Sequence, residues 1–428
     1  MKKQLRGILG GIAAAVVLAA VILGFWYVAA HPIPAAMLQQ SPQGKGAEEP
    51  TGSDTLPLKK GSCREPFGPG QEMQGTAQEP DDSREDSRSE PTETLPGGEG
   101  ETESFDFTLC FAGDINLDEN WDTTLFLEEQ PEGIYDCISA ELVEAMQTAD
   151  IMCLNNEFTY STGGSPLPGK AYTFRADPER VEVLRQLGVD VVTLANNHVY
   201  DYGKEALLDT FAVLEQAGVP YFGAGRTLED AMAPLYLEVG GKTIALVAAS
   251  RAEKNKMTPQ ATDTEPGILR CYDTELFLQA IREGKENADF CIAFVHWGTE
   301  YSFELEQVQK DTGREYLDAG ADAVIGAHSH CLQGMEFYDG KPIIYSLGNY
   351  WFNKKTLDTM LLQLHFSGDD AGTELTVQVI PAVQSGCRTV YAAEETEQRR
   401  IFEFLESISV NVEIGEDGTV TERHDQGP

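Results

Sequence analysis

Five short polar motifs carry the residues of this chain that could perform chemistry. Two of them supply histidines directly after apolar runs: His296 follows FCIAFV, and His328 and His330 follow AVIGA. The other three supply carboxylates, amides and one more histidine, and they are Gly113-Asp114-Ile115-Asn116, Asn155-Asn156-Glu157 and Ala195-Asn196-Asn197-His198. Each motif alone is weak, since a polar residue after a strand is often a helix cap. Five in succession predict a common site, and their mixture of oxygen and imidazole donors favours Zn, Mn or Fe.

These motifs must be positioned by the strand-like and helix-like runs that alternate along residues 105–393. Strands are predicted at 107–112, 151–155, 189–195, 290–295 and 321–325, and helices at 135–148, 178–187, 204–216, 275–286 and 305–319. Hairpins are predicted at 235–249 and 335–346, and a further antiparallel pair at 359–380. This alternation indicates an α/β fold whose sheets are covered by helices. Ligands of such folds bind beyond the carboxyl ends of the strands, where the motifs lie.

The chain begins with the basic segment MKKQLRG and a nearly uninterrupted apolar run at 8–30. A helix of about 20 apolar residues spans a bilayer. Because the Lys and Arg residues precede the run, the N-terminus is predicted to be cytoplasmic. A cleaved signal peptide is the alternative, but its apolar region is usually only about 7–15 residues long. We therefore predict that residues 1–30 are a cytoplasmic stub and a transmembrane anchor, in a single-pass protein of the cell membrane with an extracytoplasmic C-terminal domain.

Three further segments follow the predicted anchor. Residues 31–104 are rich in Pro, Gly, Ser, Thr, Glu and Asp and have few side chains able to fill a core, so they are predicted to be a disordered acidic tether. Residues 105–393 are predicted to form the folded domain. Residues 394–428 are predicted to contain one amphipathic helix and a polar tail.

Charge and cysteine content exclude several classes of partner. The formal net charge of the 428-residue chain is −39. Since contacts to a phosphate backbone need clustered Lys and Arg, we expect no nucleic-acid partner. The eight cysteines form no Cys-x-x-Cys pair, and several lie within apolar strand-like runs. They are therefore predicted to be small buried hydrophobes rather than zinc ligands or a disulfide framework.

The order of the motifs carries a resemblance to a known family. GDIN, NNEF, ANNHVYDYG, HWGTEY and GAHSHCLQ, followed by YSLGNYWF, span residues 107–352. This series resembles the CapA family of poly-gamma-glutamate capsule synthesis proteins, which is similar in its strand-end ligand pattern to the calcineurin-like metallophosphoesterases. The resemblance implies a four-layer α/β/β/α sandwich of the metallophosphoesterase type, in an extracytoplasmic domain tethered to the membrane.

The resemblance also implies a ligand scheme for one or two divalent metal ions. Asp114 and His330 would hold the first ion. Asn197, His296 and His328 would hold the second, Glu157 would bridge the two, and His198 would be the general acid. The chain departs from the metallophosphoesterase pattern at two positions: Asn116 stands where that pattern has a histidine, and Glu157 where it has an aspartate.

Five residues near the motifs are predicted to bind substrate: Arg175, Glu300, Tyr301, Ser346 and Asn349. Solvated loop charge, helix capping or a structural turn would explain them about as well. The function predicted from the resemblance is a metal-dependent hydrolase of a phosphoester or a glutamyl amide, involved in capsule or poly-gamma-glutamate biosynthesis. The alternative is a non-catalytic scaffold in a polymer export or anchoring complex. The expected partners are the membrane and other polymer-synthesis or export proteins.

Overall fold

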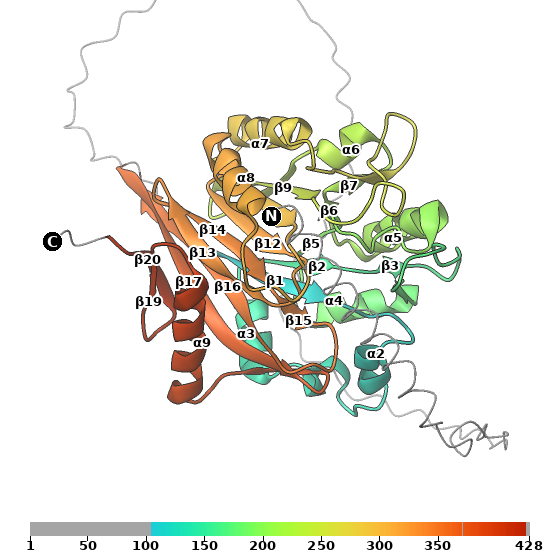
Figure 1. Cartoon of the computed structure of the whole chain (residues 1–428), viewed down its shortest axis with the longest axis horizontal. Coiled ribbons are helices and arrows are strands. Elements are labelled where there is room, and N and C mark those ends of the chain that lie inside the picture. Colours follow the sequence, from blue (N-terminus) through green and yellow to red (C-terminus); the bar gives the residue numbers. More distant parts are fainter. Residues whose placement is uncertain (1–103, 370, 425–428) are drawn as a thin grey trace, which may run out of the picture. The chain divides into compact units, whose positions relative to one another are not determined.

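Two β-sheets stacked face to face form the centre of the protein (Figure 1). The computed structural model describes residues 104–369 and 371–424. Within these residues, the larger sheet has ten strands in the order β19-β20-β17-β16-β1-β2-β5-β6, with β15 beside β1 and β18 beside β17. Their bounds are β1 Phe105–Ile115, β2 Ile151–Asn156, β5 Val191–Thr193, β6 Tyr221–Phe222, β15 Asn349–Trp351, β16 Leu357–Asp369, β17 Gly372–Ser385, β18 Arg388–Tyr391, β19 Val412–Ile414 and β20 Thr419–Glu422.

The smaller sheet has six strands within the described part of the chain, in the order β13-β14-β12-β11-β9-β8. Their bounds are β8 Leu235–Val239, β9 Lys242–Ser250, β11 Phe290–His296, β12 Ala323–Ala327, β13 Leu332–Tyr338 and β14 Lys341–Leu347. Two short pairs lie outside the main sheets, and they are β3 Thr159–Tyr160 with β4 Arg175–Ala176, and β7 Ala224–Gly225 with β10 Gly267–Ile268.

Helices connect many of these strands. In the described part of the chain, the α-helices are α2 Asp122–Leu127, α3 Ala140–Thr148, α4 Glu182–Gln186, α5 Gly203–Ala217, α6 Leu228–Met232, α7 Glu275–Asn287, α8 Gln307–Asp318 and α9 Glu395–Ile408. The same residues form two short 3-10 helices, η2 Gly133–Asp136 and η3 Pro178–Val181.

The strands divide their side chains between separate apolar cores, because successive residues of a strand point to opposite faces. In β1, Phe107 and Phe111 lie in the core between the two sheets, while Cys110 lies in the core beneath the helices. On the smaller sheet, Phe294 and Ile325 join the central core. Both faces of the central strands are therefore buried, which explains why these strands are nearly continuous apolar runs in the sequence.

Helices cover the outer face of each sheet and complete four layers. The helices α3, α4 and α5 share a core with the larger sheet, and α7 and α8 share one with the smaller sheet (Figure 1). The helix α9 packs against β13, β17 and β19. These layers fit the α/β/β/α sandwich that the family resemblance implied, and they leave the carboxyl ends of the central strands free to carry a site.

The predicted helix at 135–148 is wrong in its first part. The chain forms η2, leaves the helical conformation and enters α3 only at Ala140. In the gap, the Ser139 N–H donates to Thr389 O at 3.0 Å, and the Thr389 N–H donates to Cys137 O at 2.8 Å. The segment therefore pairs with β18, a contact with a distant part of the chain that no local pattern shows.

The C-terminal segment contains more structure than the predicted helix and polar tail at 394–428. The helix is present as α9, and β19 and β20 follow it. Val420 of β20 lies opposite Val377 of β17, so this segment extends the larger sheet. The proposed boundary between residues 393 and 394 stays a prediction.

The structure describes little of the chain that precedes the folded domain. The predicted anchor at 8–30 lies outside the described residues, and so does the predicted tether at 31–104 except for its last residue. Within 104–369 and 371–424, the helices are all too short or too polar to cross a bilayer.

Candidate metal centre

The polar motifs meet at the carboxyl ends of the central strands. Asp114 lies near the end of β1, Glu157 follows β2, His296 ends β11, and His328 and His330 follow β12. The strands β1 and β2 are parallel, as are β11 and β12, so each pair of carboxyl ends lies at one edge of its sheet. All five side chains are buried. The structure therefore brings together residues that lie far apart in the sequence.

The backbone at these strand ends is tightly constrained. A Cβ atom on Gly113 would lie 1.9 Å from Gly348 O, and the Asp114 N–H donates to that same carbonyl at 3.0 Å. His328 and His330 have positive φ angles of 95° and 55°. Such conformations cost about 1–3 kcal/mol each and persist where the surrounding structure imposes them, often at functional sites. The fold thus fixes the directions of both imidazoles.

The first group of side chains consists of Asp114, Glu157 and His330. One potential ligand atom of each lies within 4.8 Å of the others. His330 Nδ1 is 3.1 Å from Asp114 Oδ2 and 2.8 Å from Asn349 Oδ1. Asn155 Nδ2 donates to the other carboxylate oxygen of Asp114 at 2.7 Å. One oxygen of Asp114 therefore faces the histidine, while an amide holds the other in place.

The second group consists of Glu157, His296 and His328, again with ligand atoms within 4.8 Å of one another. His296 Nε2 lies 2.6 Å from Asn197 Oδ1, 3.0 Å from His328 Nδ1 and 3.4 Å from Glu157 Oε1. Burial lowers the pKa of both histidines well below the ordinary value. Near neutral pH the two rings are therefore uncharged, which is the form that binds a metal ion.

Glu157 belongs to both groups. Its two carboxylate oxygens are buried and have no hydrogen-bond partner among the described residues. Burial raises the pKa of Glu157 well above its ordinary value, and the charge of Asp114 raises it further. A buried polar group without partners calls for a specific cause, such as a bound ion. The donor set therefore fits one or two divalent metal ions, with Glu157 between them.

His198 lies beside this cluster without belonging to either group. Its Nε2 is 4.0 Å from Glu157 Oε1, and its Nδ1 is 2.6 Å from Asp201 Oδ2. Burial lowers the pKa of His198, while Asp201 acts in the opposite direction. With Nδ1 held by the carboxylate, Nε2 is the nitrogen that faces the cluster and could exchange a proton there.

Asp201 and Lys170 support His198, and sequence reasoning assigned neither of them a role. Lys170 Nζ lies 2.6 Å from Asp201 Oδ1 and also donates to the main-chain oxygen of Asn197. The Phe174 N–H donates to Asp201 Oδ2 at 2.7 Å. Asp201 stands three residues after His198 in ANNHVYDYG, and that spacing was the available signal. Lys170 lies in a loop of the sequence that gave no signal.

Two asparagines, to which sequence reasoning also assigned no role, link the strand ends through side-chain hydrogen bonds. Asn155 Nδ2 lies 3.3 Å from His296 Nδ1, in addition to its bond to Asp114. Asn196 Nδ2 donates to Asn155 Oδ1 at 3.0 Å, and Asn196 Oδ1 accepts from the His198 N–H at 3.0 Å. These amides connect both groups and His198, so the geometry of the cluster depends on them.

Asn116 occupies the position where a metallophosphoesterase would have a histidine. Its Oδ1 accepts the Asp118 N–H at 2.7 Å, while its Nδ2 is buried without a hydrogen-bond partner in the described part of the chain. The amide oxygen is therefore engaged in a local turn of the backbone. The first group lacks the extra imidazole that the resemblance would lead one to expect.

The residues predicted to bind substrate separate into two sets. Glu300 and Tyr301 line a cavity of about 310 Å³, together with His198 and His330. This cavity is the opening that lies against the cluster. Glu300 and Tyr301 are therefore placed where a ligand of the centre would contact them.

Arg175, Ser346 and Asn349 do not line that cavity. Arg175 Nη2 donates to Glu119 Oε1 at 2.8 Å, and Ser346 Oγ accepts from Ser329 Oγ at 2.8 Å. Asn349 contacts the imidazole of the first group, as described above. All three have structural partners, and their predicted contact with substrate stays a prediction.

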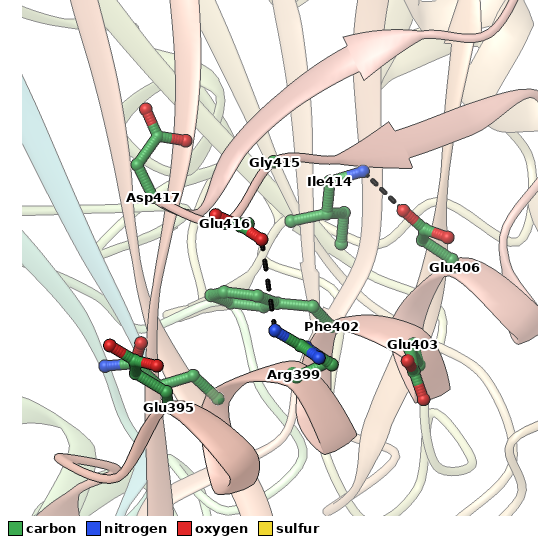
Figure 2. A pocket seen from close by; sticks show the side chains of 10 residues that line it. Glu395, Arg399, Phe402, Glu403, Glu406, Ile414, Gly415, Glu416 and Asp417 are labelled. Atoms are coloured by element: carbon green, nitrogen blue, oxygen red, sulfur yellow. Dashed lines mark hydrogen bonds and ion pairs between the residues drawn. The ribbon is translucent and has the colours of Figure 1, made fainter.

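A larger groove, of about 570 Å³, lies between α9 and the turn that joins β19 to β20. Figure 2 shows Arg399 extending from α9 toward Glu416 of the turn, next to the ring of Phe402. Its remaining charged lining is acidic and consists of Glu395, Glu403, Glu406 and Asp417. No residue of either group of potential ligands lines this groove, so the larger hollow and the candidate chemistry are separate.

The fold and the cluster define a class of protein, namely an α/β/β/α sandwich with buried carboxylates and imidazoles gathered at its strand ends. The sequence matches the family of bacterial capsule synthesis proteins, PGA_cap, over residues 108–354. That match covers more than half of the chain and includes every residue of both groups. The chain belongs to this family.

Two relatives illustrate the similarity. The PGA biosynthesis protein CapA of Bacillus subtilis (strain 168) is 34% identical over 207 residues, covering 47% of this chain and 54% of the relative. The capsule biosynthesis protein CapA of Bacillus anthracis is 33% identical over 219 residues, covering 49% of this chain and 52% of the relative. The chain thus spans about half the length of these curated relatives.

Similarity to a solved structure is much weaker. A putative 5'-nucleotidase from Staphylococcus aureus, in complex with alpha-ketoglutarate, is 15% identical with a TM-score of 0.36, and the match covers 70% of this chain and 58% of that chain. A similarity at this level carries no argument about function.

Proposed function

We propose that this protein is a metal-dependent hydrolase that takes part in the synthesis of a capsule or a poly-gamma-glutamate polymer. The observation that carries the chemical part is Glu157, whose two buried oxygens lack hydrogen-bond partners and belong to both groups of potential ligands. The biological part is supported by membership of the capsule synthesis family and by the two CapA relatives. Substrates in reach of such chemistry are phosphoesters and glutamyl amides.

The geometry of the centre suggests a separate role for each group and for His198. Each group would hold one divalent ion, Mn, Zn or Fe, with Glu157 shared between them. Ions held in this way polarise a phosphoryl or carbonyl oxygen and lower the pKa of water. His198 Nε2 faces the cluster, and with both ring nitrogens protonated the imidazolium would give its Nε2 proton to the leaving group. Asp201 fixes the tautomer of His198 by holding Nδ1.

We also propose that the domain works outside the cell, held at the membrane by the apolar run at 8–30. Support comes from the basic residues that precede this run, which favour a cytoplasmic N-terminus. Other polymer-synthesis or export proteins are the partners expected there. Protease added to intact cells should remove the domain, whereas full protection of the domain would contradict this topology.

A second candidate function is favoured by one specific observation. Asn116 stands where a fully equipped two-metal centre of this type would have a histidine, and its amide oxygen is already engaged by the Asp118 N–H. In this alternative the protein is a non-catalytic scaffold of a polymer export or anchoring complex, and the bound metal has a structural role.

The His198→Ala variant separates the two functions. Protein loaded with Mn, Zn or Fe should hydrolyse bis(p-nitrophenyl) phosphate or a glutamyl anilide. His198→Ala should lose this activity by about 10²–10⁴-fold while it keeps its metal content, because a general acid contributes to rate without holding the ion. His365→Ala, at a partly exposed histidine of β16 that pairs with Asp106, is the matched control and should behave as wild type.

Two results together would favour the scaffold function. The metal-loaded wild type would hydrolyse neither substrate, and cells that carry only His198→Ala would make normal surface polymer. Metal content measured on the same samples shows whether the ions were present during the assay.

A further inference from the structure

A wall of aromatic rings leads from the surface down to the metal cluster. Tyr172 is 60% exposed, and its ring lies edge-on to Trp121 at 5.9 Å between centroids. Trp121 in turn lies 5.0 Å from Phe174, and Phe174 lies 4.4 Å from the His198 imidazole. Phe352 continues the wall on the other side, 4.5 Å from His330. These four aromatic residues line one cavity together with His198 and His330, so a ligand in that cavity contacts the aromatic wall beside the cluster.

The same cavity is also lined by charged groups. Lys355 Nζ lies 3.4 Å from the centroid of the Tyr301 ring, and that ring lies 5.7 Å from the His330 imidazole. Lys354, its neighbour, is paired with Asp122 at 3.1 Å. Lys355 has no carboxylate within salt-bridge distance among the described residues, so it remains available to an anion beside the first group. Its position is fixed by the attraction between an ammonium ion and an aromatic face.

Glu300 lines the same cavity and has no hydrogen bond to another side chain within the described residues. A carboxylate can only accept hydrogen bonds, so it selects ligands that carry hydroxyl or amino groups. The cavity, at about 310 Å³, is at the lower limit of small-molecule sites. This volume is large enough for one ring with one charged substituent.

From this arrangement we propose that the cavity binds a sugar phosphate ester, with the sugar ring against Tyr172 and Trp121 and the phosphoryl group between Lys355 and the metal cluster. A sugar ring has an apolar face of C–H groups that suits an aromatic wall, and hydroxyl groups at its edge that suit Glu300. A linear glutamyl chain has no such face. This inference rests on the proposed hydrolase function and narrows its substrate to the phosphoester class.

Binding to the full-length protein tests this assignment. The Mn-loaded His198→Ala variant is used so that the ligand is not consumed, and two probes are compared by calorimetry: glucose 1-phosphate and glycerol phosphate, which has no ring. The ring should give glucose 1-phosphate an affinity about 10-fold higher, as expected if its contact with the aromatic wall contributes about 1.4 kcal/mol. Equal or weaker binding of glucose 1-phosphate, or no binding of either probe, overturns the proposal.

Variants in the same background assign the two halves of the ligand. Tyr172→Ala should bring the affinity ratio of the two probes close to one, whereas Tyr172→Phe keeps the ratio. Lys355→Ala should weaken both probes equally, by about 10-fold, as for loss of a hydrogen bond to a charged group, and Lys355→Arg should restore them. Tyr236→Ala, at an exposed tyrosine of β8 that does not line the cavity, is the control. An unchanged ratio in Tyr172→Ala also overturns the proposal.

Failure of this inference and failure of the proposed function are distinguishable. If wild type hydrolyses bis(p-nitrophenyl) phosphate but the probes show no ring preference, the sugar assignment alone is overturned. If the ring preference is present but wild type hydrolyses no phosphoester, the binding assignment holds and the hydrolase function fails. Tighter binding of phenyl phosphate than of glucose 1-phosphate would assign the wall to an aromatic ligand and overturn the sugar.

Discussion

The two groups of the centre differ in how many imidazoles they contain. In the second group, His296 Nε2 has Asn197 Oδ1, His328 Nδ1 and Glu157 Oε1 all within 3.4 Å. In the first group, Asp114 gives one oxygen to an amide and His330 Nδ1 is shared between Asp114 and Asn349. Both groups depend on Glu157, yet only the second contains two imidazoles.

This difference shows that a fold can bring two groups of potential metal ligands together without giving both groups the same number of imidazoles. Imidazole nitrogens suit Zn and Fe, and the second group has two of them where the first has one. The second group should therefore bind the tighter ion and the first group the weaker one. The predictions below follow this inequality from its largest expected consequence to its smallest.

Glu157→Gln should have the largest effect, because it removes the anionic oxygens that both groups share. Metal affinity at both positions should fall by more than the roughly 10–100-fold that loss of a supporting hydrogen bond costs. Metal content after gel filtration, measured by atomic emission, checks this. Glu205→Gln, at a glutamate on the exposed face of α5, is the matched control. Full retention of metal in Glu157→Gln would remove Glu157 from the centre.

His328→Ala and His330→Ala should have unequal effects. His330→Ala removes a ligand of the weaker group only, so about one equivalent of metal should remain bound in the second group. His328→Ala removes an imidazole of the tighter group, so hydrolysis and most of the bound metal should be lost together. Calorimetric titration with Mn or Zn gives the number of ions in each variant. Equal losses in the two variants would mean that the groups bind with equal strength.

The apolar strands and the polar turns that follow them could be predicted from the sequence because their signals are local. FCIAFV before His296 and AVI at 323–325 read as buried strands on composition alone, and β11 and β12 contain them, with β12 continuing to Ala327. Once strands of an α/β fold are known, their carboxyl ends must lie together. The approach of Asp114, Glu157 and the histidines followed from that rule, whereas their role as metal ligands stays a prediction.

Features that depend on distant contacts could not be predicted in this way. The break before α3 arises because Ser139 pairs with Thr389, about 250 residues later in the chain. Lys170 reaches Asp201 from a loop without pattern, and Arg175 is engaged by Glu119 rather than directed at the cavity. The sequence shows that a loop carries a charged residue, but it does not show which residue that charge pairs with.

Asn116→Asp should sharpen the comparison by strengthening the weaker group. The substitution is nearly isosteric, and the new carboxylate can still accept the Asp118 N–H while its second oxygen replaces an amide that has no partner in the described residues. Affinity for the second equivalent of Mn should rise, by about 10-fold if the added charge gains about 1.4 kcal/mol. Calorimetric titration checks this, with Asn353→Asp at the cavity rim as the control. Unchanged affinity would show that position 116 does not reach the first group.

The smallest effect should appear in metal-free protein, as a pH dependence of stability caused by the second group. Burial holds the pKa of His328 well below its ordinary value of 6.5, so the folded state binds fewer protons than the unfolded state as the pH falls below 6.5. Stability must therefore decrease from that pH downward until the folded pKa is reached, by about 1.4 kcal/mol for each unit by which the pKa is lowered. His328→Gln removes this titration, so its urea midpoint, measured in chelator at about pH 7.5 and about pH 5.5, should fall less than that of wild type. His365→Gln is the control and should retain the wild-type difference.

Equal losses of stability in His328→Gln and wild type between the two pH values would contradict this prediction. They would mean that burial does not hold the imidazole uncharged. Protons would then compete with the metal ion for the second group.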